Sequence, residues 1–188
     1  DATHQAPRTT VLKQMTPEHV LDVLTNGSMR SNAAAISDSD KRVIAEWVGG
    51  RKIDNESVGA AEKMTNLCSS HPAVRESNRP AWNGWGADLR NTRSQTAAAA
   101  GLSPAQVSRL QLKWAFGFPM GNSAYGQPAI VGGRVFAGAD TGFVYSLDAS
   151  SGCVYWSFRA SAGVRTAPTV GAGSGTNRFL LYFGDIRA

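Results

Sequence analysis

This sequence has no long apolar run, because no stretch approaches the ~20 apolar residues that a membrane-spanning helix needs. It also lacks a nucleic-acid-binding motif. Its net charge of +5 is spread along the chain, which favours an ordinary solvated surface over an RNA or DNA site. No signal peptide precedes Asp1. We therefore expect a folded protein without a membrane span or nucleic-acid partner, and interpret the chain as a processed or truncated piece of a longer one.

Composition changes along the chain and suggests a mixed fold in two modules. Residues 1–53 are typical of helices, residues 54–80 of an irregular linker, and residues 81–188 of strands and turns. The 20 glycines also favour turn-rich β structure. We expect a small all-α module followed by an all-β module.

The first module contains start and stop signals for two helices. Thr16 precedes Pro17 and is a typical N-cap, and Asn26-Gly27 can adopt the left-handed conformation that ends a helix. Ser37 caps a second helix, which Gly49-Gly50 ends. The apolar face predicted for that helix comprises Val43, Ile44, Trp47 and Val48. The sequence thus predicts two short amphipathic helices flanking a loop that contains Met29.

The second module contains a repeat. Gln127-Pro-Ala-Ile-Val-Gly returns as Ala167-Pro-Thr-Val-Gly, and the offset between Pro128 and Pro168 (168 − 128 = 40) is the length of a four-stranded propeller blade. The predicted strands of one blade are Gln127–Val131, Arg134–Ala137, Phe143–Leu147 and Val154–Phe158. The stretch that starts at Ser146 and ends at Trp156 reads as a strand end, a tight turn and a new strand. We therefore predict the opening blades, about two, of an incomplete β-propeller.

Three segments of this module resemble quinoprotein dehydrogenases. Ser146–Trp156 is similar to their Ala-x-Asp-x-x-Thr-Gly-x-x-x-Trp docking motif, with serine at the Ala and Thr positions. Residues 81–93 resemble the Trp/Gly/Asn-rich opening of such propellers, and residues 101–116 resemble the strand leading into the first full blade. The order of modules resembles the polyvinyl-alcohol dehydrogenase (cytochrome) group. That resemblance implies alcohol oxidation with pyrroloquinoline quinone (PQQ), with Ca²⁺ and a haem c that passes electrons to a downstream acceptor.

The helical module resembles the second half of a class I cytochrome c domain. In that family a loop methionine binds haem iron opposite a histidine, and Met29 is the position that matches. Met15 is the competitor, but it lies before the Thr16 cap instead of in the loop. Pro7 would match the proline whose carbonyl orients the proximal histidine. His4 and His19 are the histidines of this module, and each is better interpreted as a polar surface residue.

The attachment motif for haem c, Cys-x-x-Cys-His, is absent from this sequence. Cys68-Ser-Ser-His71 has serine in place of the second cysteine and follows the helical module, so we interpret it as linker. The family would place the motif just upstream of Asp1.

The residues before each blade's first strand are candidates for the cofactor site, because that strand lines the central channel. PQQ carries three carboxylates, and Arg165 could pair with one of them or polarise a quinone oxygen. Tyr125, Gln127 and Thr166 are further candidates. The alternative is that Arg165 bridges two blades. Asp140 and Asp148 both lie in turns that look structural, so we expect the catalytic base and most calcium ligands beyond Ala188.

The sequence thus predicts part of a periplasmic or secreted PQQ-dependent alcohol dehydrogenase, acting on an alcohol or a polymeric alcohol, with the chain alone inactive. A non-enzymatic propeller scaffold of the bacterial envelope is the alternative, and a plain electron-transfer cytochrome would explain only the first module. In an oxidising compartment Cys68 and Cys153 could form a disulfide, and two buried free thiols are the other possibility.

Overall fold

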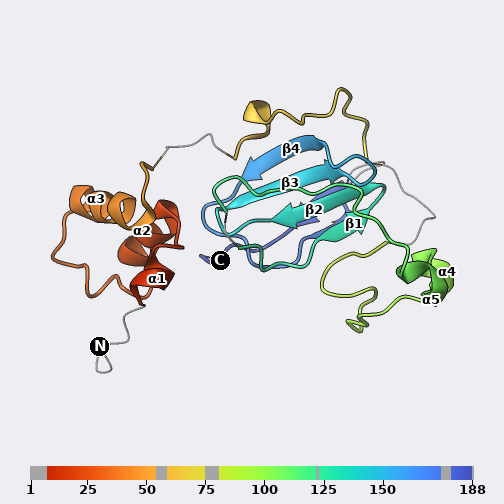
Figure 1. Cartoon of the computed structure of the whole chain (residues 1–188), viewed down its shortest axis with the longest axis horizontal. Helices are drawn as coiled ribbons and strands as arrows, with labels where there is room; N and C mark the ends of the chain where they lie inside the picture. The colour runs from red at the N-terminus through yellow and green to blue at the C-terminus, as the bar shows by residue number, and fades with distance from the viewer. Residues whose placement is uncertain (1–7, 54–58, 75–80, 122, 175–178, 188) are drawn as a thin grey trace. The chain divides into compact units, whose positions relative to one another are not determined.

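The computed structural model describes residues 8–53, 59–74, 81–121, 123–174 and 179–187 and divides the chain into two compact units (Figure 1). The helical unit comprises Asp1–Val58 with Met120–Asn122, and the sheet unit comprises Gly59–Pro119 with Ser123–Ala188. Pro7 and His4, both named in the haem hypothesis, lie outside the described residues.

The helical unit contains α1 (Thr9–Leu12), α2 (Pro17–Thr25) and α3 (Asp38–Gly49). The Thr16 hydroxyl accepts a hydrogen bond from the His19 amide at 3.2 Å, as expected of the N-cap of α2. At α3 the Ser37 hydroxyl accepts from the Asp40 amide at 3.1 Å, and Gly50 ends the helix with φ of 72°. Both predicted helices are confirmed, because their caps are local features of sequence.

The predicted apolar face of α3 is wrong. Val43 is 60% exposed and Trp47 is 80% exposed, whereas Ala45 is fully buried. A Cβ atom on Gly49 would lie 2.4 Å from Pro17 Cδ, so α3 meets the start of α2 through backbone. Ala45 and Gly49 are one turn apart, so α3 packs through small residues and leaves Val43, Ile44 and Trp47 exposed.

The sheet unit is built on a four-stranded antiparallel sheet in the order β1-β2-β3-β4 (Figure 1). Its strands are β1 (Ala129–Val131), β2 (Arg134–Gly138), β3 (Phe143–Asp148) and β4 (Val154–Arg159). The four predicted strands are confirmed, although β1 begins after Gln127 and Pro128; proline has no N–H to donate to a ladder. A second sheet pairs β5 (Thr169–Ala172) with β6 (Phe179–Tyr182).

Both faces of β3 are buried. Phe143, Tyr145 and Leu147 belong to one core cluster, against which Trp114, Phe116 and Phe118 pack. Val144, on the opposite face of β3, belongs to another cluster. Around β1 and β2, a third cluster joins Ala129 and Phe136 to Val170 of β5. The two sheets therefore pack against each other, as neighbouring propeller blades do.

A tryptophan locks the turn between β3 and β4. Trp114 Nε1 donates a hydrogen bond to the Ala149 carbonyl at 3.1 Å. Gly152 has φ of 75°, and a Cβ there would lie 2.6 Å from Trp114 Cδ2. The turn thus needs glycine for both its backbone conformation and its contact with the indole.

Residues 59–74, which the sequence indicated as linker, pack on the sheet. The Cys68 amide donates to the Val154 carbonyl at 2.9 Å, and the Val154 amide donates to the Asn66 carbonyl at the same distance. Leu67 forms a parallel bridge with Val154, and Cys68 forms a disulfide with Cys153. The bridged form of the two cysteines is therefore the one in the structure, and this segment extends the free edge of β4.

Residues 81–107 connect to both sheets. Trp82 and Ile130 of β1 exchange backbone hydrogen bonds at 3.0 and 2.6 Å. The Asn83 side chain donates to the Val170 carbonyl and accepts from the Val170 amide, both at 2.7 Å. Two short helices follow, α4 (Ala97–Ala100) and α5 (Pro104–Val107). This stretch therefore holds the edge of one sheet next to β5 of the other.

Candidate cofactor site

The two loops that the repeat relates lie in backbone contact. A Cβ atom on Gly126 would lie 2.5 Å from the Thr166 carbonyl oxygen, so only glycine fits between these segments without a shift. Tyr125 and Arg165 occupy equivalent repeat positions (165 − 125 = 40). The structure therefore brings the ring and the guanidinium named from the sequence to the same place.

Arg165 is held from two directions. Its Nε donates to Asp140 Oδ1 at 3.0 Å, and its Cζ lies 4.8 Å from the centroid of the Tyr125 ring. The Arg165 side chain is 41% exposed. Within the described parts of the chain, its two terminal nitrogens have no hydrogen-bond acceptor. Arg165 therefore offers a free, forked pair of donors at an open surface.

Asp140 is the partner that sequence reasoning missed. Its side chain is only 10% exposed, and its backbone amide donates to the Ser123 carbonyl at 3.4 Å. A Cβ on Gly163 would lie 2.6 Å from the Asp140 carbonyl oxygen. The backbone of Asp140 is therefore held between the loop before β1 and the loop before β5, and its carboxylate is largely buried there. The sequence showed only a turn aspartate, because its partner is 25 residues away.

The other two candidate residues differ in how they are engaged. The Thr166 hydroxyl donates to the Gly184 carbonyl at 3.0 Å and accepts from the Gly184 amide at 2.7 Å. It therefore anchors the segment after β6 and has little capacity left for a ligand. Gln127 is half-buried directly before β1.

Asp148 is engaged within its own turn. Hydrogen bonds from the Ser150 hydroxyl and then from the Tyr155 hydroxyl hold the pKa of Asp148 well below its usual range. Tyr155 also stacks on Arg134, whose Cζ lies 4.0 Å from the ring centroid. Arg134 donates to Ser146 Oγ and to the Pro72 carbonyl, and burial lowers the pKa of its guanidinium. A carboxylate so engaged holds the turn and is a poor proton acceptor.

The haem hypothesis rests on methionines of the helical unit. Met29 is 38% exposed, and its amide donates to the Val23 carbonyl at 3.2 Å in the loop after α2. Met15 is half-buried just before the Thr16 cap. Across the described ranges, no three His, Cys, Asp or Glu side chains gather into a group that could hold a metal ion. Likewise, no described helix is both long and apolar enough to cross a membrane.

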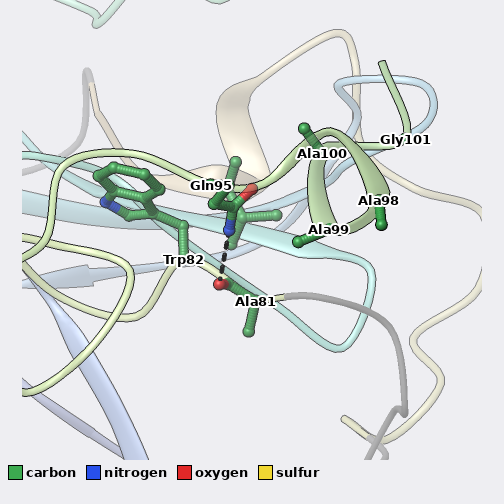
Figure 2. Close-up of a pocket in the computed structure, with 8 residues that line it drawn as sticks. Ala81, Trp82, Gln95, Ala98, Ala99, Ala100 and Gly101 are labelled. Atoms are coloured by element: carbon green, nitrogen blue, oxygen red, sulfur yellow. Dashed lines mark hydrogen bonds between the residues drawn. The ribbon is translucent and has the colours of Figure 1, made fainter. Parts of the chain in front are cut away.

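A separate cavity of about 410 Å³ lies beside β1 (Figure 2). Its lining residues are Ala81, Trp82, Gln95, Ala98, Ala99, Ala100, Gly101 and Ile130. Gln95 Nε2 donates to the Ala81 carbonyl at 3.1 Å, so its polar end is engaged. The cavity contains no charged group and none of the predicted site residues, so it is not the expected cofactor site.

Comparison with known proteins supports the propeller interpretation. A PQQ-type family model, described as "Outer membrane protein assembly factor BamB", matches residues 84–174. A polyvinylalcohol dehydrogenase of Pseudomonas sp. is 33% identical over 196 aligned residues, covering 96% of this chain and 30% of that protein. A polyvinylalcohol dehydrogenase of Sphingopyxis sp. (strain 113P3) is 32% identical over 199, covering 98% of this chain and 30% of that protein. No solved structure matches this chain significantly.

The four-stranded antiparallel sheet, the second sheet packed on it and the family match are consistent with part of a PQQ-type β-propeller. The chain is similar to two polyvinylalcohol dehydrogenases over almost its whole length, which confirms the resemblance inferred from its sequence. It spans 30% of the length of these relatives.

Proposed function

We propose that this chain is part of a PQQ-dependent dehydrogenase that oxidises alcohols, polymeric alcohols among them. The observation that carries this proposal is the extent of the match, since the similarity to two polyvinylalcohol dehydrogenases covers 96% and 98% of the chain. It therefore includes the helical unit as well as the sheet unit. This similarity supports the proposed substrate class and enzyme type.

Arg165 and Tyr125 suit a planar tricarboxylate such as PQQ. The open terminal nitrogens of Arg165 would pair with a carboxylate, and the ring of Tyr125, itself 58% exposed, would pack against the ligand. When bound, PQQ supplies the quinone that accepts electrons from the alcohol. Gln127 and Thr166 are secondary candidates, Thr166 through the loop it anchors. No described residue is assigned as catalytic base or calcium ligand.

For residues 1–53, which make up most of the helical unit, we propose the second half of a class I cytochrome c domain, with Met29 as axial ligand of a haem c and Met15 as the alternative. The thioether of Met29 lies on a partly exposed side chain, so an iron ion could reach it. The large apolar side chains Val43 and Trp47 are also exposed, as expected of residues that would pack against the apolar haem ring. Such a domain would pass electrons to a downstream acceptor.

A periplasmic or secreted location fits the disulfide. Cys68 and Cys153 are bridged, and structural disulfides persist mainly in oxidising compartments. The disulfide therefore supports our proposal of a location in the bacterial envelope.

A propeller scaffold without enzymatic activity is the second candidate. It is favoured by the name of the matching family, an outer membrane protein assembly factor. In such a protein Arg165 would only tie the two loops together through Asp140 and Tyr125. PQQ binding separates the two candidates.

The test is a titration of the intact apo-protein with PQQ and Ca²⁺, followed by alcohol-dependent dye reduction. We expect Arg165→Ala to weaken PQQ binding by about 2 kcal/mol, because a charge-assisted bond is lost. Arg165→Lys should restore only part of that loss, since a point charge cannot reproduce the planar fork.

Arg159 is a control for a ring-stacked guanidinium, because its Cζ lies 4.7 Å from the centroid of the Phe143 ring and it is not one of the proposed PQQ-binding residues, although it ends β4 on the same side of the sheet. Arg159→Ala should leave PQQ affinity unchanged. Unchanged affinity with a lowered Tm in Arg165→Ala would make Arg165 a structural tie. Failure of the wild-type protein to bind PQQ would favour the scaffold.

A further inference from the structure

We propose that Asp140 is the positioning residue for Arg165: its carboxylate holds Nε and so directs the two terminal nitrogens towards a carboxylate of the bound cofactor. This inference rests on the proposed function, because it takes Arg165 as the anion-binding group. It adds a residue that touches no ligand itself and acts through the guanidinium.

A free arginine side chain makes a poor anion site, because it loses rotamer freedom when it binds. Arg165 lies on an open surface with a 41% exposed side chain, so surrounding protein restrains it little. The 3.0 Å bond to Asp140 and the ring of Tyr125 are its anchors in the described structure. Because one anchor fixes Nε and the other covers a face, the remaining donors point in one direction.

Asp140 is suited to this role because it is itself fixed. Its side chain is 10% exposed, its amide bonds to Ser123, and Gly163 approaches its backbone closely. The two loops thus fix the position of Asp140, and Asp140 in turn fixes the position of the Arg165 guanidinium.

The negative charge of Asp140 weakens anion binding, whereas its hydrogen bond to Arg165 strengthens it. A carboxylate beside Arg165 repels an anionic ligand, so removing Asp140 has two opposed effects on affinity. Asp140→Asn separates them, because the amide oxygen still accepts from Nε while the negative charge is gone. Asp140→Ala removes both the acceptor and the charge.

The experiment measures PQQ affinity by calorimetric titration of the intact apo-protein in the presence of Ca²⁺. The variants are Asp140→Asn, Asp140→Ala, Arg165→Ala and the double variant of Asp140→Ala with Arg165→Ala. We expect Asp140→Asn to bind PQQ as tightly as the wild type or more tightly. Asp140→Ala should bind about tenfold more weakly, since it loses a bond to a charged group.

The double variant distinguishes positioning from a general structural role. If Asp140 acts through Arg165, adding Asp140→Ala to Arg165→Ala should change affinity less than twofold. A similar tenfold loss in both backgrounds would overturn the proposal, because Asp140 would then act independently of Arg165. Tighter binding by Asp140→Ala would also overturn it and identify Asp140 as a competitor for the guanidinium.

Three further outcomes are distinguishable. If Asp140→Ala does not fold, Asp140→Leu, which also lacks an acceptor and a charge and leaves a smaller void, takes its place in the same comparison. If the wild type binds no PQQ, the proposed function fails and this inference fails with it. If the wild type binds PQQ, Arg165→Ala binds it more weakly and Asp140→Ala binds it like the wild type, the proposed function stands and this inference alone is wrong.

Discussion

The disulfide between Cys68 and Cys153 should contribute a large part of the stability of the sheet unit. The two cysteines are 85 residues apart, and a cross-link closing a loop of that length is expected to remove roughly 4.5 kcal/mol of conformational freedom from the unfolded chain. The backbone bonds between Val154 and residues 66 and 68 keep the segment docked without the bridge. Breaking the bridge should therefore act mainly on the unfolded state.

We expect the double variant Cys68→Ala/Cys153→Ala to lose about 2–5 kcal/mol in the free energy of unfolding. The corresponding fall in Tm is on the order of 10 °C for a protein of this size. The assay is urea and thermal unfolding followed by circular dichroism, with and without reductant. Reductant should destabilise the wild type and leave the double variant unchanged. Equal stability of wild type and variant, or unlinked peptides after non-reducing digestion, would refute the reasoning.

Three further predictions concern other parts of the chain. Because the folded-state pKa of Asp148 is lowered, its stabilising contribution is present above about pH 4 and lost as pH falls. Asp148→Asn should therefore be less stable than wild type at pH 7, and denaturant midpoints of the two should converge in acid. Gly152→Ala should destabilise the protein by about 2 kcal/mol, through left-handed strain and contact with Trp114. Gly133→Ala is its control, because Gly133 has φ of 78° with nothing within 4 Å of the added carbon. If both variants lose the same free energy of unfolding in denaturant, contact with the Trp114 indole does not contribute to the loss. In haem-loaded intact protein, Met29→Ala should abolish the methionine–iron charge-transfer band and lower the reduction potential. Survival of the band in that variant, with its loss on changing Met15, would transfer the ligand role.

The blade was predictable because its signals are local. Alternating apolar residues, Gly132-Gly133 and the turn at Asp148 each act within a few positions, and β2, β3 and β4 formed where they indicated. The helix caps at Thr16 and Ser37 were predictable for the same reason.

Features that depend on distant partners were not predictable. Ala45 is buried in place of Val43 and Trp47 because α3 meets α2 through small residues, which a hydrophobic pattern does not indicate. Residues 66–68 carry no strand signal of their own and are ordered by Val154. In the candidate site, Arg165 and Tyr125 followed from the repeat, whereas the bond to Asp140 depends on how two loops meet.

The pairing of Leu67 with Val154 has a consequence for how the protein behaves in a crowded compartment. An outer strand with free N–H and C=O groups is a template on which strands of other molecules can assemble. In this chain, residues 66–68 occupy the first part of the β4 edge, and the adjacent disulfide prevents them from leaving. The disulfide that restrains the unfolded chain thus also protects the folded chain against edge-to-edge aggregation.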